Sequence, residues 1–310
     1  MSASKIAGRF GLGLTALLAA TALSPAAAPA LAQEAGEDDT IIVTGTRAAN
    51  RSALSTASPV DVISADDLSQ GGVTEVSQAL SVALPSFNFP RPGLADGTDT
   101  IRPATLRGLA PDQTLVLLNS KRRHAASLVN VNGTVGRGSS AVDMNTIPSG
   151  AVGSIEVLRD GASALYGSDA IAGVINVRLR EEASGGGVTL SYGQRITTVE
   201  TLVAAPPAGA NWTVANLASR DVTDGETVTL GGWIGLPLGE NGFLTISGEY
   251  LDQQETIRTA PDWRSQYSAG APFSPAEATI NRLNAWYGEP RIEQYTLFAN
   301  AGYDLAGGAE

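Results

Sequence analysis

The sequence contains no cysteine and a single histidine, which removes two common kinds of chemistry. Without cysteine the chain forms no disulfide, so packing and strand pairing alone must hold its fold. A zinc site built from cysteine and histidine ligands is excluded for the same reason. His124, the single histidine, belongs to the basic run 121–124, which we interpret as a solvated turn because short charge runs are usually exposed.

Catalytic signatures are missing as well. Gly161-Ala162-Ser163-Ala164 begins like the G-x-S-x-G nucleophile elbow, but Leu165 stands where the last glycine belongs. The chain has no G-x-x-x-x-G-K-[ST] phosphate loop. We therefore expect no enzyme, and neither a resident metal nor a cofactor.

Basic residues are too few for a nucleic-acid-binding protein. The chain has 20 Lys and Arg against 31 Asp and Glu, which gives a formal net charge of −11 at pH 7. Nucleic-acid surfaces depend on clustered Lys and Arg that neutralise phosphates. No nucleic-acid partner is therefore expected.

Long apolar runs are also absent. The run Phe10–Ala22 follows Lys5 and Arg9, and the small-x-small sequence Ala30-Leu31-Ala32 comes after it. This order predicts a secretory signal peptide over residues 1–32. An N-terminal membrane anchor is the alternative, but the run is shorter than the roughly 20 residues that a spanning helix needs.

A short β-prone run lies near the start of the expected mature chain. Thr40–Thr44 has the sequence TIIVT and follows the acidic stretch 33–39. We predict a strand without a partner of its own. A flexible linker rich in Ser, Ala and Thr follows and completes the segment 33–58.

The pattern predicts a small α+β domain over residues 59–182. Ser64 and Asp67 fit a capping box at a helix start, and Thr74–Leu84 has the apolar face of a second helix with Thr74 as its cap. Short strands are expected at Pro59–Ile63, Thr105–Leu109, Thr114–Leu118 and Ser154–Arg159.

Three glycines precede a further strand in this domain. Gly161, Gly167 and Gly173 suit a backbone that turns tightly or packs closely against a neighbour. The residues after them alternate between apolar and polar, which predicts a strand with one buried and one wet face. The apolar positions are Ile175, Val177 and Leu179, and the polar positions are Asn176, Arg178 and Arg180.

Residues 185–310 have the alternation of four amphipathic strands, around 188–193, 227–236, 244–250 and 294–304. Their connections are alternately long, at 196–226 and 253–290, and short, at 239–242 and 307–308. This rhythm is typical of outer-membrane β-barrels. A soluble antiparallel sheet with one buried face is the alternative. Four strands close no barrel, so the chain is expected to be a fragment.

Five motifs over residues 39–180 resemble, in order and spacing, the plug domain of TonB-dependent outer-membrane receptors. They are TIIVTGTR (40–47), TLRGL (105–109), DQTLVLLNSKR (112–122), VDMNTIP (142–148) and SIEVLRDGASALYGSDAIAGVINV (154–177). Ser120 departs from the family pattern, which usually has glycine there, so a slightly strained turn is expected. The resemblance implies an α+β plug domain followed by antiparallel transmembrane β-strands of an incomplete outer-membrane β-barrel.

The resemblance also implies roles for individual residues. The TonB box would be Thr40, Ile41, Ile42, Val43 and Thr44. This segment would add as a strand to TonB, whose inner-membrane partners are ExbB and ExbD. Arg107, Glu156 and Arg159 would contact the barrel, and a salt bridge inside the plug is the alternative. The glycine-rich segment would pack against the barrel wall.

The function implied by the resemblance is import across the bacterial outer membrane, in contact with its lipid, driven by proton-motive force. The ligand stays open among a siderophore-iron complex, a corrinoid and a carbohydrate. Trp263, Tyr267, Trp286 and Tyr287 are candidates for stacking on it, although loop aromatics more often pack on each other. A soluble periplasmic binding or signalling module formed by the plug alone is the alternative function.

Overall fold

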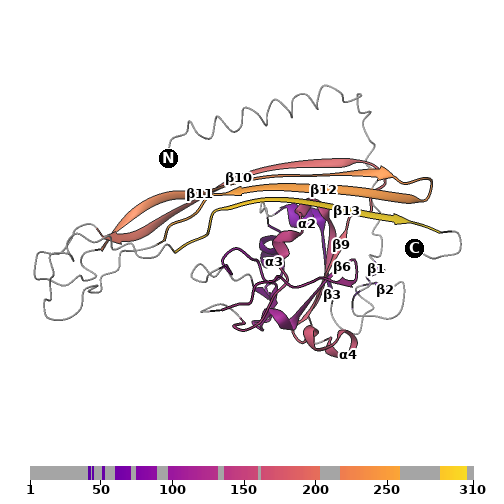
Figure 1. Cartoon of the computed structure of the whole chain (residues 1–310), viewed down its shortest axis with the longest axis horizontal. Coiled ribbons are helices and arrows are strands. Elements are labelled where there is room, and N and C mark those ends of the chain that lie inside the picture. The colour runs from indigo at the N-terminus through magenta and orange to yellow at the C-terminus, as the bar shows by residue number, and fades with distance from the viewer. Residues whose placement is uncertain are drawn as a thin grey trace, which may run out of the picture. The chain divides into compact units, whose positions relative to one another are not determined.

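The computed structural model describes parts of the chain that all lie in the compact unit 41–310 (Figure 1). They are residues 41–42, 44, 51–52, 60–70, 75–88, 97–131, 136–159, 162–202, 217–258 and 287–305. The expected signal peptide, Thr40, Val43 and the glycine turn at 307–308 lie outside them. Within these parts, no helix has the length and apolar character needed to cross a membrane.

A five-stranded mixed sheet is the core of the first domain. Its strands are β3 (Val60–Ser64), β6 (Thr114–Leu118), β7 (Lys121–Arg122), β8 (Val152–Leu158) and β9 (Gly173–Leu179), in the spatial order β3-β8-β9-β6-β7. β6 and β9 are parallel, and the other neighbours are antiparallel. Two short antiparallel pairs accompany the sheet: β1 (Ile41–Ile42) with β2 (Arg51–Ser52), and β4 (Phe87–Asn88) with β5 (Thr105–Leu106).

Short helices connect these strands. They are α2 (Ala65–Gln70), α3 (Val76–Ala83), α4 (Ser163–Tyr166) and the 3-10 helices η2 (Pro111–Gln113), η3 (Met144–Thr146), η4 (Ser149–Ala151) and η5 (Ser168–Ala170). The predicted capping box of α2 is confirmed, because the Asp67 N–H donates to Ser64 Oγ at 3.2 Å and the Ser64 N–H donates to Asp67 Oδ2 at 3.1 Å. The hydroxyl and then the N–H of Ser64 stabilise the carboxylate and lower the pKa of Asp67.

Helix α3 differs slightly from its prediction. Its N-cap is Glu75, which makes no side-chain capping bond, so the prediction of Thr74 as the cap was wrong. Val76, Ala79 and Leu80 are buried as expected, but Ala83 is exposed.

Strand β9 is buried on both faces, which corrects the prediction of one wet face. Val174 packs in one apolar cluster, while Ile175 and Val177 pack in another. Asn176 is completely buried as well. The reason is that β9 lies inside the sheet, between β8 and β6. Alternation alone does not distinguish a solvated polar residue from a buried one that is hydrogen-bonded.

Gly173 packs closely, but its neighbour is the domain's own sheet. Its φ is +145°, and an added Cβ would lie well inside 3.0 Å of the carbonyl oxygen of Leu158 on β8. Gly167 has a φ of +94° with open space around it. The expectation that this segment packs against the barrel wall is therefore wrong for Gly173, and for Gly167 it stays a prediction. Gly161 lies outside the described residues.

The turn between β6 and β7 has the strain expected for Ser120. Asn119 and Ser120 form its two-residue loop with φ values of +47° and +64°. Positive φ at both central positions defines a type I′ turn, which favours Asn-Gly. The Ser120 N–H donates to Asn176 Oδ1 at 2.9 Å, which fixes the turn against β9.

Four long antiparallel strands follow as a second sheet, side by side in chain order (Figure 1). They are β10 (Gly186–Leu202), β11 (Leu217–Pro237), β12 (Gly242–Gln253) and β13 (Ile292–Tyr303). All four predicted strands are confirmed. The predicted long connection 196–226 was wrong, because β10 and β11 stay paired as far as Leu202 and Leu217. A register shift between Gly193 and Arg195 interrupts the alternation of the strand pair there, and the predicted strand ends at this point.

This second sheet exposes apolar side chains and buries polar ones. Its most exposed apolar residues are Val188, Leu190, Tyr192 and Ile196 on β10, and Tyr295 and Leu297 on β13. On the opposite face the buried polar residues are Thr229, Thr245, Ser247 and Gln253. A soluble sheet has the reverse arrangement, with apolar residues inside. The polarity is that of strands which face lipid outside and a polar lumen inside.

Candidate functional site

The polar face of the strands is bonded to the main chain of the first domain. Glu249 on β12 accepts from the Ser149 N–H at 3.1 Å and from the Ser149 hydroxyl at 2.8 Å. Thr245 Oγ1 accepts from the Glu182 N–H at 2.9 Å and donates to the Glu182 carbonyl at 3.1 Å. These bonds attach two separate segments of the first domain to one strand.

Arg180 is the centre of a second contact between the sheets. Its guanidinium lies 4.7 Å from the ring of Trp233 on β11, and its Nε donates to the Gly150 carbonyl at 3.1 Å. Asn300 on β13 donates to the Arg180 carbonyl at 2.9 Å. Gly150 itself packs on β11, since an added Cβ would lie 3.3 Å from the Gly232 carbonyl oxygen. Arg180 thus contacts both β11 and β13 of the second sheet.

The basic run 121–124 is only partly the solvated turn that we expected. Lys121, Arg122 and His124 are exposed, and Arg122 pairs with Asp169. Arg123 is half-buried, and its guanidinium lies 5.8 Å from the ring centre of Phe298 on β13.

The two arginines expected to contact the barrel bond to plug residues. Arg159 pairs with Asp61, with 2.6 Å between Nε and Oδ2 and 3.0 Å between Nη2 and Oδ1. Arg107 donates from Nη1 to the Arg159 carbonyl at 3.3 Å. These contacts are the internal plug pairing that we gave as the alternative. Pairing of Arg107 and Arg159 with barrel glutamates stays a prediction.

Glu156 and Thr44 meet inside the first domain. Thr44 is 1% exposed and Glu156 is 3% exposed. The Thr44 N–H donates to Glu156 Oε2 at 3.0 Å, and the Thr44 hydroxyl donates to the same oxygen. Sequence reasoning placed these residues in two different roles, as TonB box and barrel contact, and no signal in the sequence paired them.

The expectation of a partnerless strand in TIIVT is wrong. Ile41 pairs with Ser52 and Ile42 pairs with Arg51, so β1 and β2 form a short antiparallel pair. This pair was not predictable, because β2 is only two residues long and lies in a stretch whose composition predicts a linker.

A cavity of about 570 Å³ lies between Asp99 and Arg102 of the first domain and one end of the four-stranded sheet. On the sheet side, its lining comes from β10 and from residues that flank 259–286 in the chain. The strand side of its lining includes Arg195, Thr256, Arg258 and Glu289. Volumes of roughly 300–1,000 Å³ are typical of small-molecule sites.

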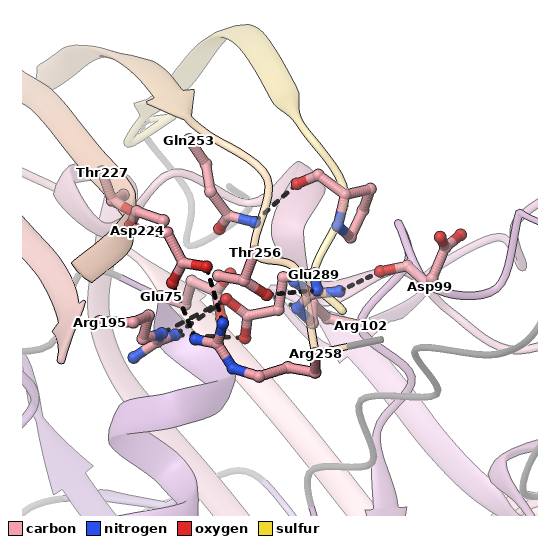
Figure 2. Close-up of polar contacts among 12 residues, drawn as sticks. Glu75, Asp99, Arg102, Arg195, Asp224, Thr227, Gln253, Thr256, Arg258 and Glu289 are labelled. Carbon is pink, nitrogen blue, oxygen red and sulfur yellow. Dashed lines mark hydrogen bonds and ion pairs between the residues drawn. The ribbon is translucent and has the colours of Figure 1, made fainter. Parts of the chain in front are cut away.

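Two guanidinium-carboxylate pairs contribute Arg195, Arg258 and Glu289 to this lining (Figure 2). Arg195 donates from Nη2 to both carboxylate oxygens of Glu289 at 3.2 Å, and Arg258 donates to Asp224 at 2.7 and 2.8 Å. The Thr256 N–H donates to the Glu289 carbonyl at 3.0 Å. Bidentate pairs fix geometry as well as charge, so this network holds the residues on either side of 259–286 in place.

Sequence reasoning missed these four charged residues. Arg195 and Glu289 are 94 positions apart, and neither stands in a motif. Of the four candidate loop aromatics, only Tyr287 is described, and its carbonyl accepts from the Arg258 N–H at 2.7 Å. Within the described parts, no group of three or more His, Cys, Asp and Glu side chains is placed to hold a metal ion.

Comparisons with known proteins connect this architecture to a family. Residues 52–174 match the family model described as TonB-dependent Receptor Plug Domain. The chain is 30% identical over 271 residues to a protein of Vibrio cholerae serotype O1 named vitamin B12 transporter BtuB, an alignment that covers 87% of this chain and 36% of the relative. The chain therefore spans about a third of the length of such relatives.

Two solved structures are similar at lower identity. A mutant of the ferric enterobactin receptor PfeA from Pseudomonas aeruginosa, in complex with enterobactin, has a TM-score of 0.44 at 22% identity and is matched over 65% of this chain and 26% of that chain. The siderophore receptor PirA from Acinetobacter baumannii has a TM-score of 0.42 at 22% identity, over 64% and 25% of the two chains.

The family match covers most of the five-stranded sheet and its connecting helices, the same region that carries most of the sequence motifs. The four antiparallel strands begin shortly after it, at Gly186. Residues 52–174 therefore match the plug domain of TonB-dependent receptors, and four antiparallel strands follow this region.

Proposed function

We propose that this chain is the plug and first barrel strands of an outer-membrane receptor that imports a scarce ligand. The reversed polarity of the four-stranded sheet carries this proposal. Leu190 and Leu297 are 70% and 77% exposed, whereas Thr245 and Ser247 on the plug side are each 3% exposed. Exposed leucines suit lipid, and the buried hydroxyls suit a lumen filled by the plug. The family match and a relative named as a vitamin B12 transporter support the same function.

The ligand is proposed to bind at the end of the sheet that holds the cavity. The lining of the cavity comes from the first domain, from β10 and from residues just before and just after 259–286, and it includes three arginines, Arg102, Arg195 and Arg258. A siderophore-iron complex, a corrinoid and a carbohydrate are the ligand classes under this proposal. Binding there would place the ligand against the plug and the strands at once.

Energy is proposed to arrive through TonB, with ExbB and ExbD coupling it to the proton gradient. Thr40–Thr44 would pair with TonB by strand addition, in which main-chain hydrogen bonds supply the affinity. A side-chain change such as Val43→Ala keeps those groups and should be mild. Ile42→Pro removes an N–H donor at a cost of about 3 kcal/mol or more in regular structure, which corresponds to a loss of TonB affinity of roughly a hundredfold.

The experiment compares the parental receptor with its Ile42→Pro and Val43→Ala variants in whole cells. Binding and energised uptake are measured with cyanocobalamin and with ferric enterobactin as probes. We expect the Ile42→Pro receptor to bind the transported probe normally but to lose its uptake. Adding a protonophore to cells with the parental receptor should abolish uptake in the same way. Uptake at the parental rate in Ile42→Pro, or parental uptake that persists with the protonophore, would contradict the coupling proposal.

A soluble periplasmic module formed by the plug alone is the second candidate, and the exposed apolar face of the strands argues against it. Cell fractionation separates the two functions. Recovery in the outer-membrane fraction, with extraction only by detergent, supports the receptor. Recovery in the periplasmic fraction without detergent supports the soluble module.

A further inference from the structure

The arginines that line the cavity are neutralised by carboxylates of the same region. Arg195 and Arg258 each bond a carboxylate in the two pairs of Figure 2. The Nε atom of Arg102 lies 3.4 Å from Glu75 Oε1, in a pair whose side chains are only 1% and 9% exposed. Asp99 in the lining adds a further acidic residue. The described part of the cavity therefore has more carboxylates around it than guanidinium groups.

A β-bulge in β11 supplies one of these carboxylates, that of Asp224. Strands β10 and β11 pair at Gly193 and Thr227 and next at Arg195 and Asp224, so β11 has one more residue than β10 between these pairs. Gly225, inside the bulge, has a φ of +64°, which favours glycine. The extra residue reverses the faces of β11 beyond this point. Asp224 thus lies on the same face as Arg195, which lines the cavity.

An anionic ligand would have to compete with these carboxylates. Moving Arg102 away from Glu75 would take the guanidinium from a buried carboxylate, and breaking a buried ion pair is strongly destabilising. The pairs of Arg195 and Arg258 hold their geometry as well as their charge. The surplus of carboxylates also repels a ligand of the same sign. The cavity is therefore poorly suited to an anionic iron chelate.

The same pairs place hydrogen-bond donors and acceptors side by side. Arg195 bonds Glu289 through Nε and Nη2, so among the described residues its Nη1 keeps both N–H donors. Gln194 and Thr197 in the lining add an amide and a hydroxyl, each of which donates and accepts. A sugar hydroxyl also donates and accepts, so it bonds a guanidinium and a neighbouring oxygen at once.

We infer that the cavity takes an uncharged carbohydrate. This inference rests on the proposed function and narrows its ligand classes to one. Asp224 and Glu289 are then specificity-determining residues, because they neutralise arginines that would otherwise attract an anion. Removing either carboxylate charge shifts the preference of the cavity from neutral to acidic sugars.

The test measures ligand affinity by calorimetry on the detergent-purified receptor. The neutral probes are maltotriose, cellotriose and xylotriose. Trigalacturonate is the matched anion, a trisaccharide with a carboxylate on each ring, and ferric enterobactin and cyanocobalamin represent the other two ligand classes. We expect at least one neutral sugar to bind about tenfold or more tightly than each of these three probes, a difference of about 1.4 kcal/mol.

Two variants test the residues that set this preference. Asp224→Asn and Glu289→Gln should each raise the affinity for trigalacturonate about tenfold and lower the affinity for the neutral sugar. Asp221→Asn is the matched control, because it makes the same change on β11 but on the opposite face, where Asp221 accepts from the Thr198 hydroxyl at 2.8 Å. Asp221→Asn should stay within about twofold of the parental receptor.

The results separate the ligand class from the proposed function. Tightest binding of trigalacturonate, ferric enterobactin or cyanocobalamin by the parental receptor overturns the inference, and so does the absence of binding by all three neutral sugars. Equal responses of Asp224→Asn and Asp221→Asn, repeated with Glu289→Gln, overturn charge selection by these carboxylates. Energised uptake of ferric enterobactin overturns the inference and leaves import standing. Tight sugar binding without uptake in whole cells supports the inference and contradicts import.

Discussion

Replacing Gly173 with alanine should open the centre of the plug sheet. The position has a φ of +145°, and the new Cβ would lie well inside 3.0 Å of the Leu158 carbonyl oxygen. Leu158 pairs with Val174, so the clash falls on the β8–β9 ladder itself. The backbone conformation costs about 1–3 kcal/mol for a non-glycine residue, and overpacking adds about 1–3 kcal/mol. We expect Gly173→Ala to destabilise the plug by about 2–6 kcal/mol.

Gly167→Ala is the matched control, because Gly167 also has a positive φ of +94° but open space around its Cβ position. It should cost only the conformational part, about 1–3 kcal/mol. Hydrogen exchange of peptides from 152–179, in the detergent-solubilised receptor, reports local opening. We expect Gly173→Ala to lose protection there by roughly a hundredfold, and Gly167→Ala to lose less. Equal protection in the two variants would refute the argument from the Leu158 carbonyl.

Three further predictions concern the turn, the contact between the sheets and the outer face. Ser120→Gly should stabilise the plug by about 1 kcal/mol, because glycine relieves a φ of +64°, and a lower denaturation midpoint would contradict this. Arg180→Ala should loosen the plug through loss of the Trp233 contact and so raise the permeability of the outer membrane to large antibiotics. Arg178→Ala is the control, because Arg178 pairs with Glu181 at 3.7 Å, and it should leave the permeability unchanged. Equal permeability in the two variants would refute a special role for Arg180. Leu190→Lys should reduce heat-resistant receptor in the outer membrane by costing about 2–4 kcal/mol in lipid, and Ser191→Lys, on the lumen side, should be tolerated; the reverse order would show that the faces are misassigned.

Local signals in the sequence predicted the parts of the fold that depend on local interactions. The Ser64 and Asp67 capping box lies within four residues, and its geometry is the one that the sequence implies. The four long strands followed from alternation of polar and apolar residues. The slightly strained turn at Ser120, expected because the resembled family usually has glycine there, is present with a φ of +64°.

Features that depend on distant partners were not predictable in this way. Asn176 is buried because Thr44 and Glu156, 132 and 20 positions away, satisfy its hydrogen bonds. A single sequence gives no measure of such pairing, so a buried polar residue and a solvated one produce the same alternation. The same limit applies to the Arg195–Glu289 pair at the cavity, whose members are brought together only by the order of the strands.

The two hydrogen bonds between Thr245 and Glu182 attach the C-terminal end of the plug to β12 more firmly than its N-terminal end is held. Residues 180–185 lead straight from β9 into β10, and Thr245 holds both main-chain groups of Glu182 in that short passage. At the other end of the domain, β3 is an edge strand, and β8 is its only partner among the residues that the structure describes. A load applied to the chain before β3 therefore peels an edge strand one residue pair at a time, while the passage into β10 is anchored to β12. Mechanical failure of this domain should begin at its N-terminal edge and leave its C-terminal attachment in place.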